Sequence, residues 1–310
     1  MRRKHAGCKS TVDTAGRVIE NQAMIYAGID AGSRAIKVVL LRAPNKVPFE
    51  SVQGREPALR LCSGPRACRV VERLACVSAP QGPLPQRHAE ELYRSVLTQH
   101  GIQADDVRYV VATGYARSNV RFANSTITEI TCHAAGVHHL LPDVRTVVEI
   151  GGQDSKILWL SPSGTVRDFA MNDRCAAGTG RFLEMVASRM ERTVDEMGLL
   201  ACPSAKPAAI SSMCAVFAET EIIGLLASAT RCEDFQNIVA GVQQAVASRI
   251  AAMAGGSVTP PLAFTGGVAL LAGMDKALAA ALGQAVVVPP KPQFTGALGA
   301  ALLARAEGKK

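Results

Sequence analysis

The chain has 310 residues, which is enough for one large domain or two medium ones with a real core. Hydrophobic residues make up 48% of the chain, with 27 glycines and few aromatic residues, as is ordinary for an α/β protein. The net charge of +8 comes from scattered basic residues, which argues against nucleic-acid binding and suits small acidic ligands such as nucleotides. No apolar run reaches the roughly 18 residues of a membrane span, so we expect no membrane contact.

The N-terminal part of the chain begins with a basic, polar stretch without the apolar core of a secretory signal. We expect residues 1–23 to form a disordered extension. Apolar residues on both sides of a Gly-Ile-Asp-Ala-Gly-Ser turn predict a strand, a tight turn and a second strand over residues 23–41. Residues 44–88 are rich in proline, glycine and arginine and are predicted to be irregular, apart from a short strand at 74–77. This segment holds three cysteines that we interpret as structural: Cys62, Cys68 and Cys76.

The middle of the chain repeats the pattern of its beginning. Helical periodicity marks residues 88–100 and 127–141, and a buried strand running into a glycine turn lies between them at 107–116. The stretch "VVEIGGQDSKILWL" then resembles the earlier "IYAGIDAGSRAIKVVLL", because in both an apolar strand meets a glycine turn and continues into a second strand after a lysine. This internal repeat predicts two related halves that meet near residue 143.

The C-terminal half is predicted to be mainly helical. Helices are expected over residues 178–192, 215–229 and 234–254. A strand, a Gly-Gly turn and a helix start follow in "PLAFTGGVALLAG". The run "AVVVPP" predicts a strand that two prolines end, and "GALGAALLARAEG" predicts a closing helix.

Three glycine turns that directly follow strands are candidate phosphate-binding sites. Glycine lets backbone N–H groups approach phosphate oxygens closely, and a nearby carboxylate can hold Mg²⁺ through water. Each turn alone is also what an ordinary turn looks like, but three of them in a repeated frame favour a nucleotide cleft between the halves. Their residues are Asp30, Gly32, Ser33 and Lys37 in the first, Gly151, Gly152, Gln153 and Asp154 in the second, and Gly266 and Gly267 in the third.

Two cysteines precede predicted helices, where the partial positive charge of a helix N-terminus favours the thiolate form that ligates metals. They are Cys175 and Cys214. The chain has nine cysteines and no Cys-x-x-Cys pair, so it lacks a self-contained zinc or ferredoxin-type motif. Two thiolates cannot complete a four-thiolate iron–sulfur site, although a two-fold dimer would supply four. Burial as two small core residues is the alternative.

The same runs closely resemble the ATPase activators of 2-hydroxyacyl-CoA dehydratases and the related ATPase subunits of benzoyl-CoA reductase. The resemblance covers about residues 24–305 and rests on these segments: "GIDAGS", "ATGYAR", "TEITCHA", "IGGQDSK", "MNDRCAAGTGRFLE", "SSMCAVFAETEI", "FTGGVA" and "GALGAALLA". It implies the α/β fold of acetate and sugar kinases, Hsc70 and actin, which is ribonuclease H-like, with two related lobes around a nucleotide cleft. The expected lobes are 24–143, completed by the C-terminal helix 296–310, and 144–295.

The resemblance also implies roles for individual residues. Cys175 and Cys214 are expected to ligate a [4Fe-4S] cluster shared between two subunits, which are either identical or paralogous. The first two glycine turns are expected to hold the phosphates of ATP or ADP with Mg²⁺, and Gly266 and Gly267 the nucleoside side. Glu219 is expected near the ribose or base. Asp154 or Gln153 is expected to orient the hydrolytic water.

The function implied is ATP-driven transfer of single electrons from the cluster to a partner 2-hydroxyacyl-CoA dehydratase. We expect it in an anaerobic or micro-oxic cytoplasm. Reduced ferredoxin or flavodoxin is the expected electron donor. A subunit of a benzoyl-CoA reductase, a small-molecule kinase and a non-enzymatic nucleotide-binding scaffold are the alternatives. We further expect cluster and nucleotide to lie at opposite ends of the same helices. Cys132 and His133 are expected to be packing or hinge residues, and His138 and His139 to be a solvated or capping pair.

Overall fold

The computed structural model describes residues 11–12, 18–19, 23–44, 71–201, 206–210 and 214–308. Most of the predicted extension and of the segment with Cys62 and Cys68 therefore lies outside the described residues. Within the extension, β1 (Thr11–Val12) and β2 (Val18–Ile19) form an antiparallel pair. Among the described helices, none is both long and apolar enough to cross a membrane.

The first large sheet is built around the predicted hairpin at the start of the ordered chain. Its strand order is β5-β4-β3-β6-β7, with β3, β4 and β5 antiparallel and β6 and β7 joined in parallel. The strands are β3 (Ala23–Ala31), β4 (Ala35–Pro44), β5 (Glu72–Pro80), β6 (Val107–Thr113) and β7 (Ser125–Thr126). The strand expected at 74–77 is thus longer than predicted and forms the edge of this sheet.

The second large sheet repeats the first strand for strand. Its order is β10-β9-β8-β11-β12, again with an antiparallel side and a parallel side. The strands are β8 (Thr146–Ile150), β9 (Ser155–Leu160), β10 (Val166–Asn172), β11 (Leu262–Thr265) and β12 (Val286–Val287). The matching topology confirms the predicted pair of related halves and the two-lobed α/β fold. Strand β10 was not predicted.

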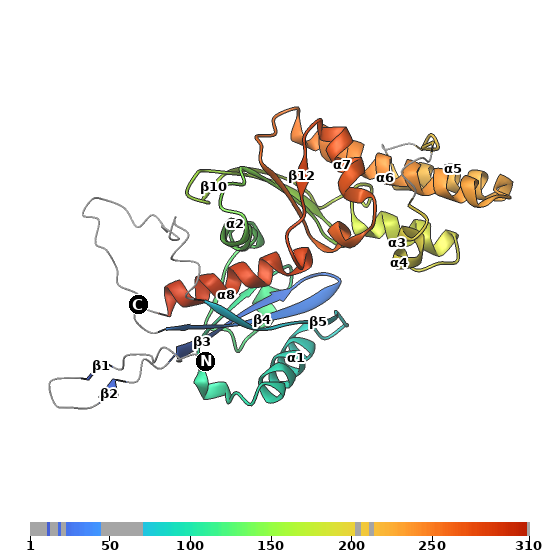
Figure 1. The fold of residues 1–310 in the computed structure, drawn as a ribbon. Coiled ribbons are helices and arrows are strands. Elements are labelled where there is room, and N and C mark those ends of the chain that lie inside the picture. The colour runs from blue at the N-terminus through green and yellow to red at the C-terminus, as the bar shows by residue number, and fades with distance from the viewer. Residues whose placement is uncertain are drawn as a thin grey trace, which may run out of the picture.

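The described α-helices cover both faces of each large sheet (Figure 1). They are α1 (Pro85–Gln99), α2 (Glu129–Leu140), α3 (Gly180–Arg189), α4 (Val194–Gly198), α5 (Ala215–Ser228), α6 (Cys232–Ala254), α7 (Met274–Leu282) and α8 (Thr295–Glu307). The short α4 and most of α7 were not predicted from the sequence.

Alternation along β3 explains how the first sheet is covered. Ile25, Ala27 and Ile29 pack against α1 on one face, whereas Tyr26 on the other face belongs to the cluster that includes α2 and α8. Burying both faces of the central strand accounts for its nearly continuous apolar sequence. The last helix of the chain thus packs on the first sheet.

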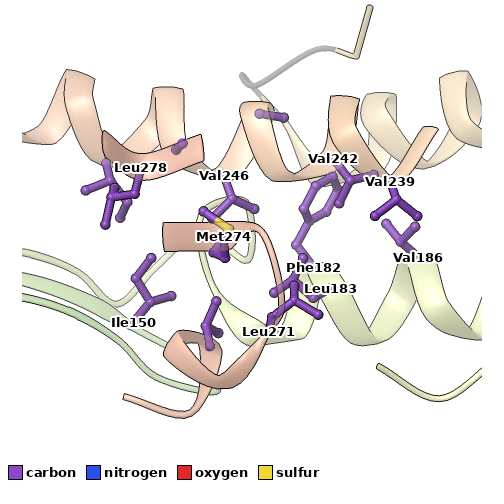
Figure 2. Close-up of a cluster of buried hydrophobic side chains, with 14 of the residues drawn as sticks. Ile150, Phe182, Leu183, Val186, Val239, Val242, Val246, Leu271, Met274 and Leu278 are labelled. Atoms are coloured by element: carbon purple, nitrogen blue, oxygen red, sulfur yellow. The ribbon is translucent and has the colours of Figure 1, made fainter. Parts of the chain in front are cut away.

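The second sheet carries the largest hydrophobic cluster of the described chain on one of its faces. Ile150 from β8 meets Phe182 and Leu183 of α3, Val246 of α6 and Leu278 of α7 there (Figure 2). On the opposite face, side chains of β8 and β9 pack against α2. Because α2 lies on the second sheet and α8 on the first, the contact between these two helices joins the halves (Figure 1).

Glycines allow α2 and α8 to touch backbone to backbone. A Cβ placed on Gly136 would lie 2.0 Å from the carbonyl oxygen of Thr295, and one on Gly299 would lie 1.7 Å from that of Cys132. Both distances are far below any real carbon–oxygen contact, so the two helices can pack at this distance only while these positions lack side chains.

Candidate nucleotide cleft and cysteine site

A cleft of about 430 Å³ lies between the two sheets, and all three predicted glycine turns line it. The structure brings together ten residues that sequence reasoning placed in a nucleotide site. They are Asp30, Gly32, Ser33, Lys37, Gly151, Gly152, Gln153, Asp154, Gly266 and Gly267. Ligands that bind open α/β sheets gather at such edges, where strands end and backbone N–H groups are free.

The first turn contains a buried ion pair. Asp30 at the end of β3 is directly opposite Lys37 in β4, and the Lys37 ammonium lies 3.0 Å from Oδ2 of Asp30. Burial raises the pKa of Asp30, but the charge of Lys37 and its hydrogen bond outweigh this and leave the pKa below its usual value. Burial likewise lowers the pKa of Lys37, and Asp30 more than compensates. Both groups are therefore charged at neutral pH.

The second turn contains the matching pair, which two further carboxylates join, Asp154 from the turn and Glu129 from α2. Glu149 faces Lys156 across β8 and β9, as Asp30 faces Lys37, and the separation along the chain is seven residues in both cases. The ammonium of Lys156 is 2% exposed and lies 3.0 Å from Glu149, 2.8 Å from Asp154 and 2.9 Å from Glu129.

The pKa values of Lys156 and Glu149 in this second group are both raised, but for different reasons. Burial lowers the pKa of Lys156, yet Glu149, Glu129 and Asp154 together raise it well above its usual value. Burial raises the pKa of Glu149, and the attraction of Lys156 does not fully offset this. A carboxylate with an increased proton affinity in a cleft is a candidate acid or base.

His133 from α2 lies beneath the first turn and lines the cleft. Burial, with the nearby Lys156, lowers its pKa to about 4, so the ring is neutral at physiological pH. Its Nδ1 lies 3.0 Å from Oγ1 of Thr295, whose own proton points to the carbonyl of Pro292. We therefore assign the ring proton to Nδ1, which donates to Thr295. The neighbouring Cys132 is buried, and burial raises its pKa to about 12.

The third turn closes the cleft beside the second. Gly266 follows β11 with φ of 91°, and a Cβ there would lie 2.2 Å from the carbonyl oxygen of Ile150. Only glycine suits both the positive φ and this approach. Gly267 begins a short 3-10 helix, Gly267–Leu270, on the cleft wall.

Glu219 lies elsewhere. It is on α5 and pairs with Arg189 of α3 at 2.6 Å, and it does not line the cleft. This geometry gives no support to the predicted contact with the ribose or base. His138, expected to be solvated or capping, is buried on α2.

The two predicted cluster cysteines are both partly exposed free thiols. Cys175 lies in the loop between β10 and α3, and Cys214 is the residue immediately before α5. Helices α3 and α5 contact each other and are tied by the Arg189–Glu219 pair. Among the described residues, no group of three or more His, Cys, Asp or Glu side chains could hold a metal ion.

The N-terminus of α3 lies at the cleft, whereas we expected its C-terminus there. The backbone N–H groups of Gly180 and Arg181 donate to the carbonyl oxygens of Gly151 and Gly152, at 2.9 and 2.8 Å. The end of α3 nearest Cys175 in the chain is therefore the end that lines the cleft. The prediction that this helix separates cysteine and nucleotide at its opposite ends is wrong, because the unpaired N–H groups of its first turn bind the second glycine turn.

Sequence reasoning missed several residues of the cleft: Glu129, His133, Glu149 and Lys156. The internal repeat held a signal for two of them, since Glu149 and Lys156 occupy the positions of Asp30 and Lys37. Glu129 and His133 come from a helix whose place over the cleft depends on tertiary packing.

Comparison with known proteins agrees with this geometry. The model of the BadF/BadG/BcrA/BcrD ATPase family matches residues 27–304. The activator of lactoyl-CoA dehydratase of Anaerotignum propionicum is 40% identical over 93% of this chain and 100% of its own length. One of the subunits of the benzoyl-CoA reductase of Thauera aromatica is 32% identical over 90% of this chain and 92% of its own.

A solved structure is similar over nearly the whole chain. The activator of 2-hydroxyisocaproyl-CoA dehydratase from Clostridium difficile, with bound ADPNP, superposes with a TM-score of 0.77. It is 35% identical and is matched over 92% of this chain and 96% of that one.

Proposed function

The chain belongs to the BadF/BadG/BcrA/BcrD ATPase family, and from this premise we propose that it hydrolyses ATP to activate a partner 2-hydroxyacyl-CoA dehydratase by electron transfer. The observation that carries the proposal is the cleft in which three glycine turns converge. The lactoyl-CoA dehydratase activator, matched over its full length, supports the same activity.

In the proposed site, the first two glycine turns hold the phosphates and the third turn lies at the nucleoside side. The backbone N–H group of Gly152 supplies a donor without adding charge, whereas those of Gly32 and Gly151 donate to the carbonyls of Ala35 and Asp154 and so fix the shape of the two turns. The carboxylates of Asp30 and Asp154 would hold Mg²⁺, through water or directly, because this ion prefers oxygen ligands. Gln153, exposed at the tip of the second turn, or Asp154 positions the attacking water.

We propose that Cys175 and Cys214 hold one [4Fe-4S] cluster together with the same two cysteines of a second chain. The donor set suits it, because both thiols are free and partly exposed and lie beside two helices in mutual contact. Such a cluster supplies one electron at a time at low potential. The chain's own part is to hold the thiolates and to link their loops to the cleft. A reduced ferredoxin or flavodoxin is the proposed source of electrons.

A second function has support from one observation. The match to the benzoyl-CoA reductase component covers 92% of that protein, so the chain could serve as the ATPase subunit of an aryl-CoA reductase. In that case its twin would be a paralogue. Native mass spectrometry of the anaerobically purified complex separates the two cases, since a homodimeric activator contains one kind of chain and a reductase complex contains several.

The central experiment combines iron content and nucleotide affinity. Anaerobic wild-type protein should be brown and hold about four iron atoms per dimer. Replacing Cys175 or Cys214 with serine should remove the iron and change the dissociation constant of ATP less than about threefold. Cys232→Ser is the matched control, since this exposed cysteine begins α6 and should be replaceable with full iron content.

The opposite results would reject parts of the proposal. Full iron content in Cys175→Ser would exclude that residue as a ligand. Colourless, iron-free wild-type protein that phosphorylates a small molecule would favour a kinase of the same fold.

A further inference from the structure

Arg34 bridges the two halves across the cleft. It lies in the turn between β3 and β4, and its Nη2 is 2.5 Å from Oε1 of Glu184 on α3. Both side chains line the cleft, and they are 48% and 30% exposed. The pair thus links the first glycine turn to a helix of the other half.

The stem of Arg34 also covers the second glycine turn. A Cβ built on Gly152 would lie 2.1 Å from Cγ of Arg34, so the arginine fits only because this position lacks a side chain. Arg34 therefore touches the second turn and α3 at once. A ligand that changes the spacing of the two turns must move Arg34 relative to at least one of them.

Helix α3 and the second turn form one unit. The first two residues of α3, Gly180 and Arg181, donate their N–H groups to the carbonyls of Gly151 and Gly152. These hydrogen bonds satisfy donors that a helix N-terminus otherwise leaves free. A force on Glu184, in the first turn and a half of α3, is therefore transmitted to the start of the helix.

The loop that carries Cys175 is fastened at both ends. At its start, Asn172 at the end of β10 accepts from the Cys175 N–H at 3.2 Å and donates to the Cys175 carbonyl at 2.9 Å. At its end, the Thr179 hydroxyl, next to α3, donates to the carbonyl of Ala176 at 2.7 Å. Because these hydrogen bonds hold the short loop at both ends, a displacement of the N-terminus of α3 also displaces the backbone of Cys175.

We propose that Arg34 and Glu184 are positioning residues whose ion pair makes the Cys175 loop respond to the nucleotide in the cleft. This inference rests on one part of the proposed function, namely that a nucleotide binds in the cleft. An ion pair this exposed contributes little to stability, so its loss should leave the fold intact. The expected effect is therefore on communication between the two sites and not on either site alone.

The test measures the thiol of Cys175 directly in iron-free protein. Its alkylation rate by iodoacetamide is followed by peptide mass spectrometry, with and without saturating ADPNP. In wild-type protein ADPNP should change this rate by about fivefold, the scale of one exposed ion pair. In Glu184→Gln the change should fall below about twofold, with the affinity for ADPNP within threefold of wild type, and Glu184→Asp should restore most of it.

Glu91→Gln is the matched control, because it removes an exposed arginine–glutamate pair on α1 away from the cleft. It should keep the wild-type response. The inference is overturned if ADPNP does not alter the rate in wild-type protein, or if Glu184→Gln responds as the control does. It is also overturned if Glu184→Gln no longer binds ADPNP, since Glu184 would then belong to the binding site itself. Iron content, measured separately, reports on the proposed function: a nucleotide response in a chain that never binds iron upholds the pair and rejects the cluster.

Discussion

The two hairpins that meet at the cleft share one frame and differ in charge. In the first, Asp30 and Lys37 form a simple pair, one carboxylate with one ammonium. In the second, the equivalent Lys156 is shared by three carboxylates. The Asp30–Lys37 pair is thus neutral overall, whereas the Lys156 group, which includes Glu129 from α2, carries excess negative charge next to where phosphates would bind.

This difference shows how a duplicated frame can divide its tasks. A neutral turn can receive phosphate oxygens without repulsion, while a turn with surplus carboxylates calls for a cation between itself and the phosphates. The second turn is also the one bonded to α3 and so to the Cys175 loop. The proposed binding of a metal–nucleotide and the proposed communication with Cys175 would therefore both involve the same half.

The largest effect should come from removing the shared ammonium. Lys156→Met would leave three carboxylates at the base of the cleft without their common partner, and we expect a loss of about 3–5 kcal/mol in the free energy of unfolding. Urea denaturation followed by circular dichroism measures it. A midpoint equal to that of wild type would show that the three carboxylates are held by something other than Lys156.

The next effect concerns pH. His133 titrates near 4 in the folded chain and near 6.5 when unfolded, so the unfolded state takes up the proton first as the pH falls. The stability that depends on neutral His133 is complete above pH 6.5 and should decrease by about 3 kcal/mol as the pH drops to 4.

Carboxylates also titrate in this range, so the measurement is the difference between wild type and His133→Gln. The groups that face the ring are Asp30, Lys37, Glu129 and Lys156. The stability of the variant should decrease less steeply between pH 6.5 and 4. Parallel curves for the two proteins would contradict the low pKa.

Breaking the Asp30–Lys37 pair should reduce the free energy of unfolding by less than removing Lys156 from its three carboxylates. Lys37→Ala leaves one buried carboxylate, Asp30, without its partner, and we expect a loss of about 1–3 kcal/mol in the free energy of unfolding. It should also weaken ATP binding by about tenfold or more, since a charge-assisted contact is lost. Isothermal titration calorimetry with ADPNP measures this change. An unchanged dissociation constant would show that the phosphates do not bind at the first turn.

The smallest effect on stability should come from the tip of the second turn. Gln153 is exposed, so Gln153→Ala should change the unfolding free energy by less than about 0.5 kcal/mol. If it positions the attacking water, ATP hydrolysis should nevertheless slow by about 10²-fold. Normal hydrolysis in this variant would leave Asp154 as the remaining candidate.

Much of the fold could be predicted from short segments of the sequence. The paired strands around residues 23–41 and 144–160 were predictable because glycine turns and β-branched runs act over a few residues, and the repeat then indicated two similar sheets. Strand β10 was missed because it presents a polar, exposed face at the sheet edge, so "VRDFAMN" shows no buried alternation. Helix α7 was largely missed because glycines flank its alanine-rich turns.

The site was predictable where one segment supplied several of its parts, as the glycine turns did. It was not predictable where distant segments meet. Glu129 reaches Lys156 only because α2 packs on the second sheet, and Arg34 reaches Glu184 only because the halves close on each other. No local pattern encodes such contacts, and the direction of α3 was misjudged for the same reason.

The position of α8 has a consequence for how the protein is made. Ala297, Ala301 and Leu302 of α8 complete a hydrophobic cluster with Val39 and Leu41 of β4, although more than two hundred residues of sequence separate the helix from this strand. During synthesis, these β4 side chains therefore lack their α8 partners until that helix has left the ribosome. Deleting α8 should expose and destabilise the first large sheet.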